Sequence, residues 1–144
     1  MRITSVRTLV VGNPWKNWVY VLLDTSEGIT GLGEATAGLM TKPVVSAVEE
    51  LAHLCLDKDP RDVHQLWDDL YKATFLTHSP AQLHAMAGIE FACWDITGKS
   101  LGVPVWRLLG GRVRDRVRIY ANGWYTGPRT PEGFARRARE VVAM

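Results

Sequence analysis

Cysteine is nearly absent from this chain of 144 residues, which has only Cys55 and Cys93. Their spacing matches no metal-binding or redox motif, and both lie in segments with helical periodicity, so we expect two free, buried thiols. Long apolar runs are also missing, since charged residues interrupt each run well short of the roughly 20 residues that a membrane span needs. Residues 1–7 contain no apolar signal core. These absences predict a cytoplasmic protein with no membrane partner.

Recognised catalytic and metal-binding motifs are absent as well. The four histidines have neither H-x-x-H nor H-E-x-x-H spacing, and no serine, histidine and acid form an arguable triad. The acidic residues of segment 57–69 are explained by helix caps and first helical turns. A dinucleotide fingerprint that starts at Gly31 and Gly33 has Thr36 where the third glycine is required, so we interpret these glycines as turn-forming residues at a strand edge. We predict neither a catalytic residue nor a metal ligand in this stretch.

Positive charge gathers at the end of the chain. Residues 107–144 hold nine arginines against three acidic residues. A basic end of this kind can bind nucleic acid or an anionic ligand. However, the arginines at 112, 114, 116 and 118 alternate, and no aromatic side chains stand between them as a stacking surface would require. We therefore interpret the segment as a solvated strand or a subunit contact and expect no nucleic-acid partner.

The first hundred residues predict a small antiparallel sheet followed by helices. Strands are expected over 3–11, 18–24 and 31–35, with a tight turn at 25–28 between the second and third. Apolar spacing predicts a first helix over 44–55 with Thr41 as its N-cap, and a second over 63–71 with Asp59 as cap and Pro60 at its first position. Ser79 and Pro80 give the same start signal for a third, nearly all-round apolar helix.

That third helix leads into a junction. The run from Ile89 to Gly111 is expected to break at Gly98, Gly102 and Pro104 and to stop at Gly110 and Gly111. Beyond it, residues 117–121 alternate as a strand that ends at 122–125, and Thr130 opens a helix through Val142. This is the beginning of an alternating β/α pattern. One such unit cannot close a parallel sheet, so we expect the natural protein to continue.

The loop at residues 13–18 is the most suggestive segment for ligand binding. It contains two tryptophans, one lysine and two asparagines. Such a composition suits a polyol or acid-sugar ligand, because ring faces stack on sugar carbons while amides bind hydroxyl groups. A loop folded on its own tryptophans explains the composition equally well, so the residues alone leave both interpretations open.

Two motifs carry a family resemblance. One is Gly31-Leu-Gly-Glu-Ala35, and the other combines Ile89-Glu90, Trp94-Asp95-Ile96, Gly98-Lys99, Leu101-Gly-Val-Pro104 and Leu108-Leu-Gly-Gly111. Together they resemble the enolase superfamily, in its mandelate racemase and muconate lactonizing enzyme branch. Segment 119–125 is especially similar to gluconate (acid-sugar) dehydratase-like members. The resemblance covers the whole chain and implies an α+β fold: a three-stranded meander with a helical bundle as an N-terminal capping domain over 1–111, and the first β/α unit of a modified TIM barrel over 112–144.

The resemblance also implies a function for the whole protein. Members of this branch hold Mg²⁺ on acidic barrel ligands, and a lysine or histidine base removes the proton α to a carboxylate. In dehydratases a second acid expels the β-hydroxyl, which gives a 2-keto-3-deoxy acid. The resemblance places this machinery beyond residue 144, whereas the cap loops fall on 12–18 and 36–42. The implied substrate-binding residues are Trp15, Lys16, Asn17, Thr36, Asn122, Trp124 and Tyr125. The implied partners are a small acid sugar and further copies of the chain in a homo-oligomer.

Other functions stay open on the sequence. Within the superfamily, a racemase, an epimerase or a cycloisomerase is the alternative to a dehydratase. Outside it, the chain would be a stand-alone α+β binding module, with the arginine-rich end as its contact surface. In either case we expect the 144-residue chain by itself to have no catalytic activity.

Overall fold

The computed structural model describes residues 1–12, 15–76 and 78–144. The chain divides into two compact units, which we call the N-terminal unit (Met1–Gly111) and the C-terminal unit (Arg112–Met144). Within the described residues, no helix has both the length and the apolar character that crossing a membrane requires.

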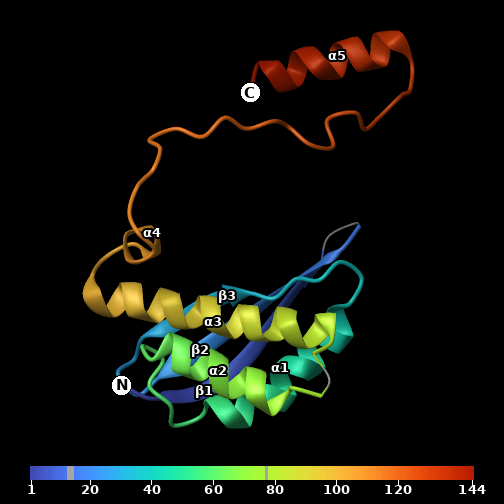
Figure 1. Cartoon of the computed structure of the whole chain (residues 1–144). Coiled ribbons are helices and arrows are strands. Elements are labelled where there is room, and N and C mark those ends of the chain that lie inside the picture. The colour runs from blue at the N-terminus through green and yellow to red at the C-terminus, as the bar shows by residue number, and fades with distance from the viewer. Residues whose placement is uncertain (13–14, 77) are drawn as a thin grey trace. The chain divides into compact units, whose positions relative to one another are not determined.

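Three antiparallel strands open the N-terminal unit: β1 (Ile3–Gly12), β2 (Asn17–Thr25) and β3 (Thr30–Glu34), in the order β1-β2-β3 (Figure 1). The predicted meander is therefore confirmed. The turn between β2 and β3 is closed by a hydrogen bond from Gly28 N to Thr25 O at 3.0 Å. Gly28 has a φ of +77°, which a residue with a side chain rarely adopts.

Four helices follow: α1 (Thr41–Cys55), α2 (Val63–Ala73), α3 (Pro80–Leu101) and the short α4 (Val105–Leu108). Figure 1 shows α1, α2 and α3 on one side of the sheet, and their apolar faces form one buried core with the inward residues of the strands. Cys55 and Cys93 are free and fully buried in this core, as predicted. Burial raises the pKa of both thiols to about 12, so neither is a reactive thiolate.

The start of α3 is confirmed in detail. Ser79 is its N-cap, and its hydroxyl accepts a hydrogen bond from Gln82 N while the Gln82 side chain accepts one from Ser79 N. This reciprocal pair is a capping box, with Pro80 at the first helical position.

The predicted starts of α1 and α2 are wrong by one and by three residues. Thr41 is already helical, since Met40 occupies the N-cap position of α1. Helix α2 begins only at Val63, because the Asp59 carboxylate is occupied by Arg61, whose backbone N–H and guanidinium both bind it. The Asp–Pro start signal therefore forms a turn before the helix.

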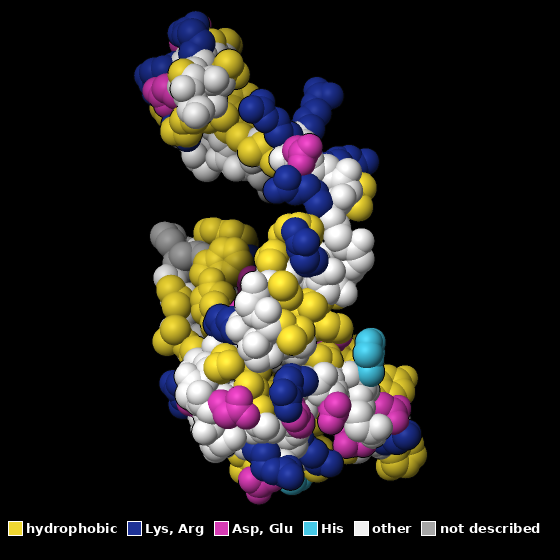
Figure 2. Space-filling model, turned by 90° about the vertical axis from the view of Figure 1, so that its left-hand side faces the viewer, with side chains coloured by type: hydrophobic (Ala, Val, Ile, Leu, Met, Phe, Trp, Pro, Cys, Tyr) yellow, Lys and Arg dark blue, Asp and Glu magenta, His cyan; other side chains and the backbone are white. Residues whose placement is uncertain are grey.

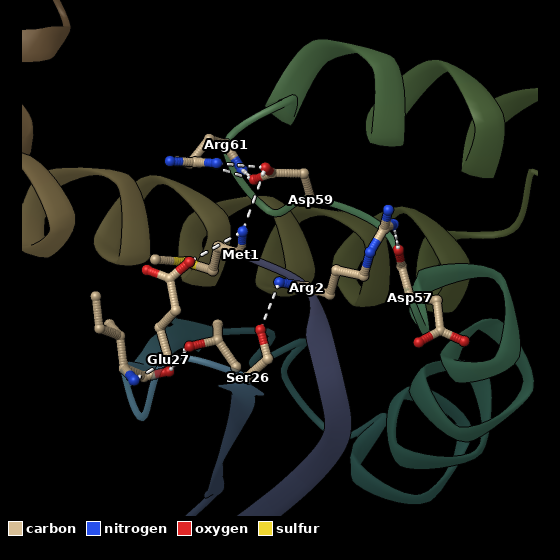
Figure 3. Close-up of polar contacts among 9 residues, drawn as sticks. Met1, Arg2, Ser26, Glu27, Asp57, Asp59 and Arg61 are labelled. Atoms are coloured by element: carbon tan, nitrogen blue, oxygen red, sulfur yellow. Dashed lines mark hydrogen bonds and ion pairs between the residues drawn. The ribbon is translucent and has the colours of Figure 1, made fainter.

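The N-terminus is fixed against this turn (Figure 3). The Met1 ammonium lies 3.0 Å from the Glu27 carboxylate and 3.9 Å from that of Asp59. Arg2 donates from its backbone N–H to the Ser26 hydroxyl and from its guanidinium to the Asp57 carbonyl. These contacts join the β2–β3 turn and the α1–α2 connection to the beginning of β1.

Gly31 and Gly33 allow α3 to pack directly on β3. A Cβ at Gly33 would overlap the carbonyl oxygen of Gly88, and one at Gly31 would overlap the carbonyl oxygen of Ala92. On the helix, Gly88 has no room for a side chain either, since a Cβ there would lie 2.8 Å from the Cβ of Ala35. Our interpretation of these glycines as turn residues is wrong: they lie inside the strand and bring two backbones together.

Two side chains of the same helix also form hydrogen bonds with main-chain groups of β3. Asp95 and Lys99, four residues apart on α3, form an ion pair at 2.7 Å. In addition, Asp95 accepts a hydrogen bond from Leu32 N at 2.9 Å, and Lys99 donates to Thr30 O at 2.7 Å. The two side chains thus occupy edge groups that would otherwise be open to another strand.

The junction after α3 differs from the prediction at one point. Gly102 is the C-cap in a left-handed conformation, and Pro104 precedes α4, as expected. Gly98, however, lies within the helix. It is a glycine because a Cβ there would lie 2.8 Å from Val103 O, where the chain folds back against the last helical turn.

In the C-terminal unit, the predicted helix is present as α5 (Pro131–Val142), with the Thr130 hydroxyl accepting a hydrogen bond from Gly133 N at 3.1 Å. The strand predicted over 117–125 is wrong, since the described residues 112–130 form no strand. A parallel strand depends on hydrogen bonds to neighbouring strands, and the C-terminal unit contains no second strand to supply them.

Asp24 is the most heavily bonded carboxylate of the sheet. It accepts hydrogen bonds from Arg7, Ser5 and Thr30, at distances between 2.6 and 3.1 Å. These donors, led by the Arg7 guanidinium, hold the pKa of the Asp24 carboxyl well below its usual range. The ionised form is therefore favoured by folding.

We predict that Gly33→Ala destabilises the fold by about 3 kcal/mol or prevents folding, because the new methyl group forces α3 away from β3. Urea denaturation followed by circular dichroism measures the change. Gly12→Ala is the matched control, since its new methyl group meets no atom of the described residues closer than 3.4 Å, and it should change stability by less than about 0.5 kcal/mol. Equal stability of the two variants would contradict the backbone-to-backbone packing.

We predict that Asp24→Asn lowers the free energy of unfolding by about 1 kcal/mol at pH 7, a value reduced for the partial exposure of the pair. Because folding lowers the pKa of this carboxyl, its contribution is fully present above the unfolded value of about 3.9 and is lost as pH falls below it. Denaturation of both proteins between pH 7 and pH 3 should show the difference shrinking toward acid pH. A difference that grows toward acid pH would contradict this assignment.

Candidate functional site

Two loops at one end of the sheet border an open hollow of about 510 Å³. The β1–β2 connection supplies Trp15 and Lys16, and the start of β2 supplies Asn17. The connection after β3 supplies Gly38 and Leu39, and the first turn of α1 supplies Thr41, Lys42 and Pro43. The two loops that the sequence marked as candidate ligand loops therefore meet. Asn13 and Pro14, which belong to the first of them, lie outside the described residues.

One hydrogen bond ties the loops together. Asn17 is the first residue of β2, and its side-chain amide donates to the Thr41 hydroxyl at 3.3 Å. Thr41 is the first residue of α1, so a strand start and a helix start are joined directly. The position of each loop thus depends on an element anchored in the core.

Aromatic rings hold the lysine of the first loop. The Lys16 ammonium lies 3.8 Å from the centroid of the Trp18 ring and 4.8 Å from that of Trp15. Both distances are within the range of a cation–π interaction. Trp15 is nevertheless 72% exposed, so a large part of its ring remains open for stacking.

The hollow has a positive lining. Among the described residues that line it, Lys16 and Lys42 contribute ammonium groups and none contributes a carboxylate. Hydroxyl and amide groups come from Thr41 and Asn17, and an aromatic face comes from Trp15. A ligand with an anionic group, several hydroxyls and a carbon chain fits this combination.

Thr36 has a different position from the one the resemblance implied. It does not line the hollow, and its hydroxyl accepts a hydrogen bond from Val19 N at 3.0 Å, which continues the pairing of β2 beyond the end of β3. Thr41 and Lys42, which do line the hollow, were missed as candidate site residues. The sequence pointed to them only as members of the loop range 36–42. The last two residues of this range begin α1, which fixes their positions.

The other three candidates belong to the C-terminal unit. Asn122 accepts a hydrogen bond from Gly123 N at 3.0 Å, which closes a local turn. The Trp124 ring packs edge-on against Tyr125 and against Phe134 of α5, and its carbonyl accepts from Arg137 Nε at 3.3 Å. Trp124 also lines a mostly apolar hollow with Tyr120, Ala121 and the last turns of α5.

A magnesium site does not fit the residues described here. Within ranges 1–12, 15–76 and 78–144, no three histidine, cysteine or acidic side chains come together as metal ligands. The described carboxylates with the strongest contacts, Asp24 and Asp59, are bound by arginines instead.

Comparison with known proteins identifies relatives of the chain. It is 42% identical over 131 residues to the D-gluconate dehydratase of Thermoproteus tenax, and 40% identical over 129 residues to the D-galactonate dehydratase of Variovorax paradoxus (strain S110). Each alignment covers 90% of this chain, but only 26% and 32% of the respective relative. The chain thus spans about a quarter to a third of the length of these proteins.

Solved structures show the same fold. An enolase from Pantoea ananatis with bound D-gluconate and Mg superposes with a TM-score of 0.75 and 37% identity, over 79% of this chain and 28% of that one. A protein provisionally named L-alanine-DL-glutamate epimerase, from Burkholderia xenovorans strain LB400 and bound to magnesium and fumarate, gives a TM-score of 0.87 and 29% identity, over 99% of this chain and 38% of that one.

Residues 5–110 match the family described as "Mandelate racemase / muconate lactonizing enzyme, N-terminal domain". The matched range begins within β1 and ends two residues past α4, so it includes both loops that border the hollow lined by Lys16 and Lys42. The chain therefore belongs to the mandelate racemase and muconate lactonizing enzyme family of the enolase superfamily.

Proposed function

We propose that this chain is the capping domain and the first β/α unit of a dehydratase that acts on acid sugars such as gluconate or galactonate. In this proposal Met1–Gly111 is the cap and Arg112–Met144 begins the catalytic barrel. The observation that carries the proposal is the hollow between the two cap loops, where Lys16, Lys42, Asn17 and Trp15 provide positive charge, a hydrogen-bonding amide and an open aromatic face. The dehydratase relatives support the reaction class.

The chemistry of the hollow matches an acid sugar better than an apolar acid. An aldonate has a carboxylate at one end and a chain of hydroxyl groups along its length. Ammonium groups and amides bind those oxygens, and a tryptophan face covers the C–H side of the chain. In this proposal these residues bind the substrate through contacts that are equal in the ground and transition states, so they lower KM.

The proposed reaction is an elimination. A base removes the proton on the carbon next to the carboxylate, the C–O bond at the β-carbon breaks, and the hydroxyl leaves as water after it takes up a proton. The resulting enol becomes a 2-keto-3-deoxy acid. We propose Mg²⁺ as the cofactor, because related structures contain it. Its ligands, the base and the acid are assigned to residues outside 1–144.

Epimerisation is the second candidate. It shares the first step, removal of a proton α to a carboxylate, and then returns a proton to the opposite face instead of losing the hydroxyl. The similarity to the Burkholderia xenovorans structure is the observation that favours it.

We predict that the full-length protein carrying this chain, supplied with Mg²⁺ and a panel of aldonates, forms a 2-keto acid from at least one of them. A colorimetric assay for 2-keto acids measures the product. A change in optical rotation without 2-keto acid would support epimerisation instead, because inversion at one of several stereocentres gives a different optically active acid. If no aldonate reacts in either way, the proposed function is wrong.

In that enzyme, Lys42→Ala should raise KM for the aldonate about five- to tenfold and leave kcat within about twofold, because the residue contributes binding that is equal in the ground and transition states. Initial rates over a range of substrate concentrations separate the two constants. Lys72→Ala is the matched control, since Lys72 is exposed on α2 and pairs with Asp68 away from the hollow. A KM unchanged by Lys42→Ala would remove this residue from the substrate site.

A further inference from the structure

Trp18 lies near the start of β2, on the side of the sheet turned away from the core. Val19 and Val21 are buried in the core, so Trp18, Tyr20 and Leu22 face the opposite side, where each is half-buried. Figure 2 shows hydrophobic side chains gathered along the left-hand edge of the N-terminal unit. A cation beside an apolar surface is less hydrated than one in open solvent, which strengthens its attraction to an aromatic ring.

Lys16 connects this ring to the candidate site. The lysine lines the hollow between the two loops, whereas Trp18 does not. Its ammonium lies 3.8 Å from the centroid of the Trp18 ring, closer than the 4.8 Å that separates it from the Trp15 ring. The direct route by which Trp18 can influence a ligand in the hollow is therefore the lysine side chain.

The two rings differ in how firmly their positions are fixed. The backbone of Trp18 pairs with Val11 of β1, and the N–H of the next residue, Val19, donates to the Thr36 hydroxyl at 3.0 Å. Trp15 precedes β2 and is 72% exposed. Trp18 is thus part of the sheet, and its ring gives the lysine ammonium a position set by the sheet.

An aromatic ring holds a cation in a way that suits an anion-binding site. A carboxylate in the same place would neutralise the ammonium, whereas a ring face attracts it and leaves its positive charge in place. The ring also limits the conformations of a long side chain in the free protein. Less conformational freedom then remains to be lost when a ligand binds.

We propose that Trp18 is a positioning residue of the candidate site. Its ring holds the Lys16 ammonium at the hollow before the acid sugar arrives, so that the charge is already in place for the oxygens of the ligand. This inference rests on the proposed function, in which Lys16 binds substrate. Trp18 itself makes no contact with substrate in this account.

The test uses initial rates of the full-length protein with Mg²⁺ and the aldonate that reacts best, with circular dichroism to establish that each variant is folded. Trp18→Leu removes the ring and should raise KM about three- to fivefold, with kcat changed by less than about twofold. Trp18→Phe keeps a smaller ring and should raise KM by about twofold or less. Tyr20→Leu is the matched control and should leave KM unchanged. It removes a ring from the same side of β2, and the cation–π contacts of the described residues do not involve Tyr20.

A variant without the lysine separates positioning from a general structural role. Lys16→Ala should itself raise KM, because it removes the charge. Adding Trp18→Leu to Lys16→Ala should then change KM by less than about 1.5-fold, since the ring no longer has an ammonium to hold. A ring that only supports the fold would have the same effect in both backgrounds.

A spectroscopic measurement on the same full-length protein follows the lysine without any substrate. With ¹³C-labelled lysine, the ε-methylene signal of Lys16 is identified by its loss in Lys16→Ala. The magnetic field of the Trp18 ring should shift this signal upfield, and the shift should disappear in Trp18→Leu and persist in Tyr20→Leu.

The outcomes distinguish this inference from the proposed function. A KM rise in Trp18→Leu that vanishes without Lys16, together with the loss of the upfield shift, supports the inference. An unchanged KM in Trp18→Leu, an equal rise in the Lys16→Ala background, or a Lys16 signal that Trp18→Leu leaves in place overturns it, while the proposed function stands. A wild-type protein that turns over no acid sugar overturns the proposed function, and the inference falls with it.

Discussion

The contact of α3 with β3 is the constraint on which the N-terminal unit depends. Glycines at 31 and 33 of the strand and at 88 of the helix leave no side chain at the points of closest approach, so the two backbones come close together there. Asp95 and Lys99 then attach the helix to the strand edge with hydrogen bonds to main-chain groups. Because α3 also packs against α1 and α2, its position on β3 fixes the other helices of the core.

The candidate ligand site follows from that geometry. Strand β3 leads through the connection that carries Leu39 into α1, whose first turn carries Lys42, and β2 begins at Asn17. The hydrogen bond between Asn17 and Thr41 is therefore made between two elements that the core already holds in place. Lys16 is kept over its tryptophan rings in the same region. The charged side chains of the two loops thus have positions that depend on elements of the core.

Much of this could be predicted from the sequence, and the failures have physical causes. Alternation and turn residues gave the three strands, and the Ser79–Pro80 signal gave the start of α3, because these features depend on local geometry. The same kind of signal at Asp59 and Pro60 failed, since Arg61 competes for the carboxylate. The roles of Gly31, Gly33 and Gly98 were predicted wrongly, because each glycine is required by a close contact that the local sequence does not show. Gly31 and Gly33 contact the backbone of α3, and Gly98 contacts the chain where it folds back after that helix. Composition identified the loop 36–42 as a candidate, but only the fold shows that Lys42 lines the hollow and that Thr36 does not.

The central claim is that the hollow between the two loops binds the polyol chain of an acid sugar. A crystal structure of the full-length protein with Mg²⁺ and D-gluconate tests it most directly. The account predicts sugar hydroxyls within hydrogen-bonding distance, about 3 Å, of the Lys42 ammonium or the Asn17 amide, with the Trp15 ring against the carbon chain. An ordered gluconate that leaves all three side chains more than about 6 Å away, beyond direct or single-water contact, would contradict it.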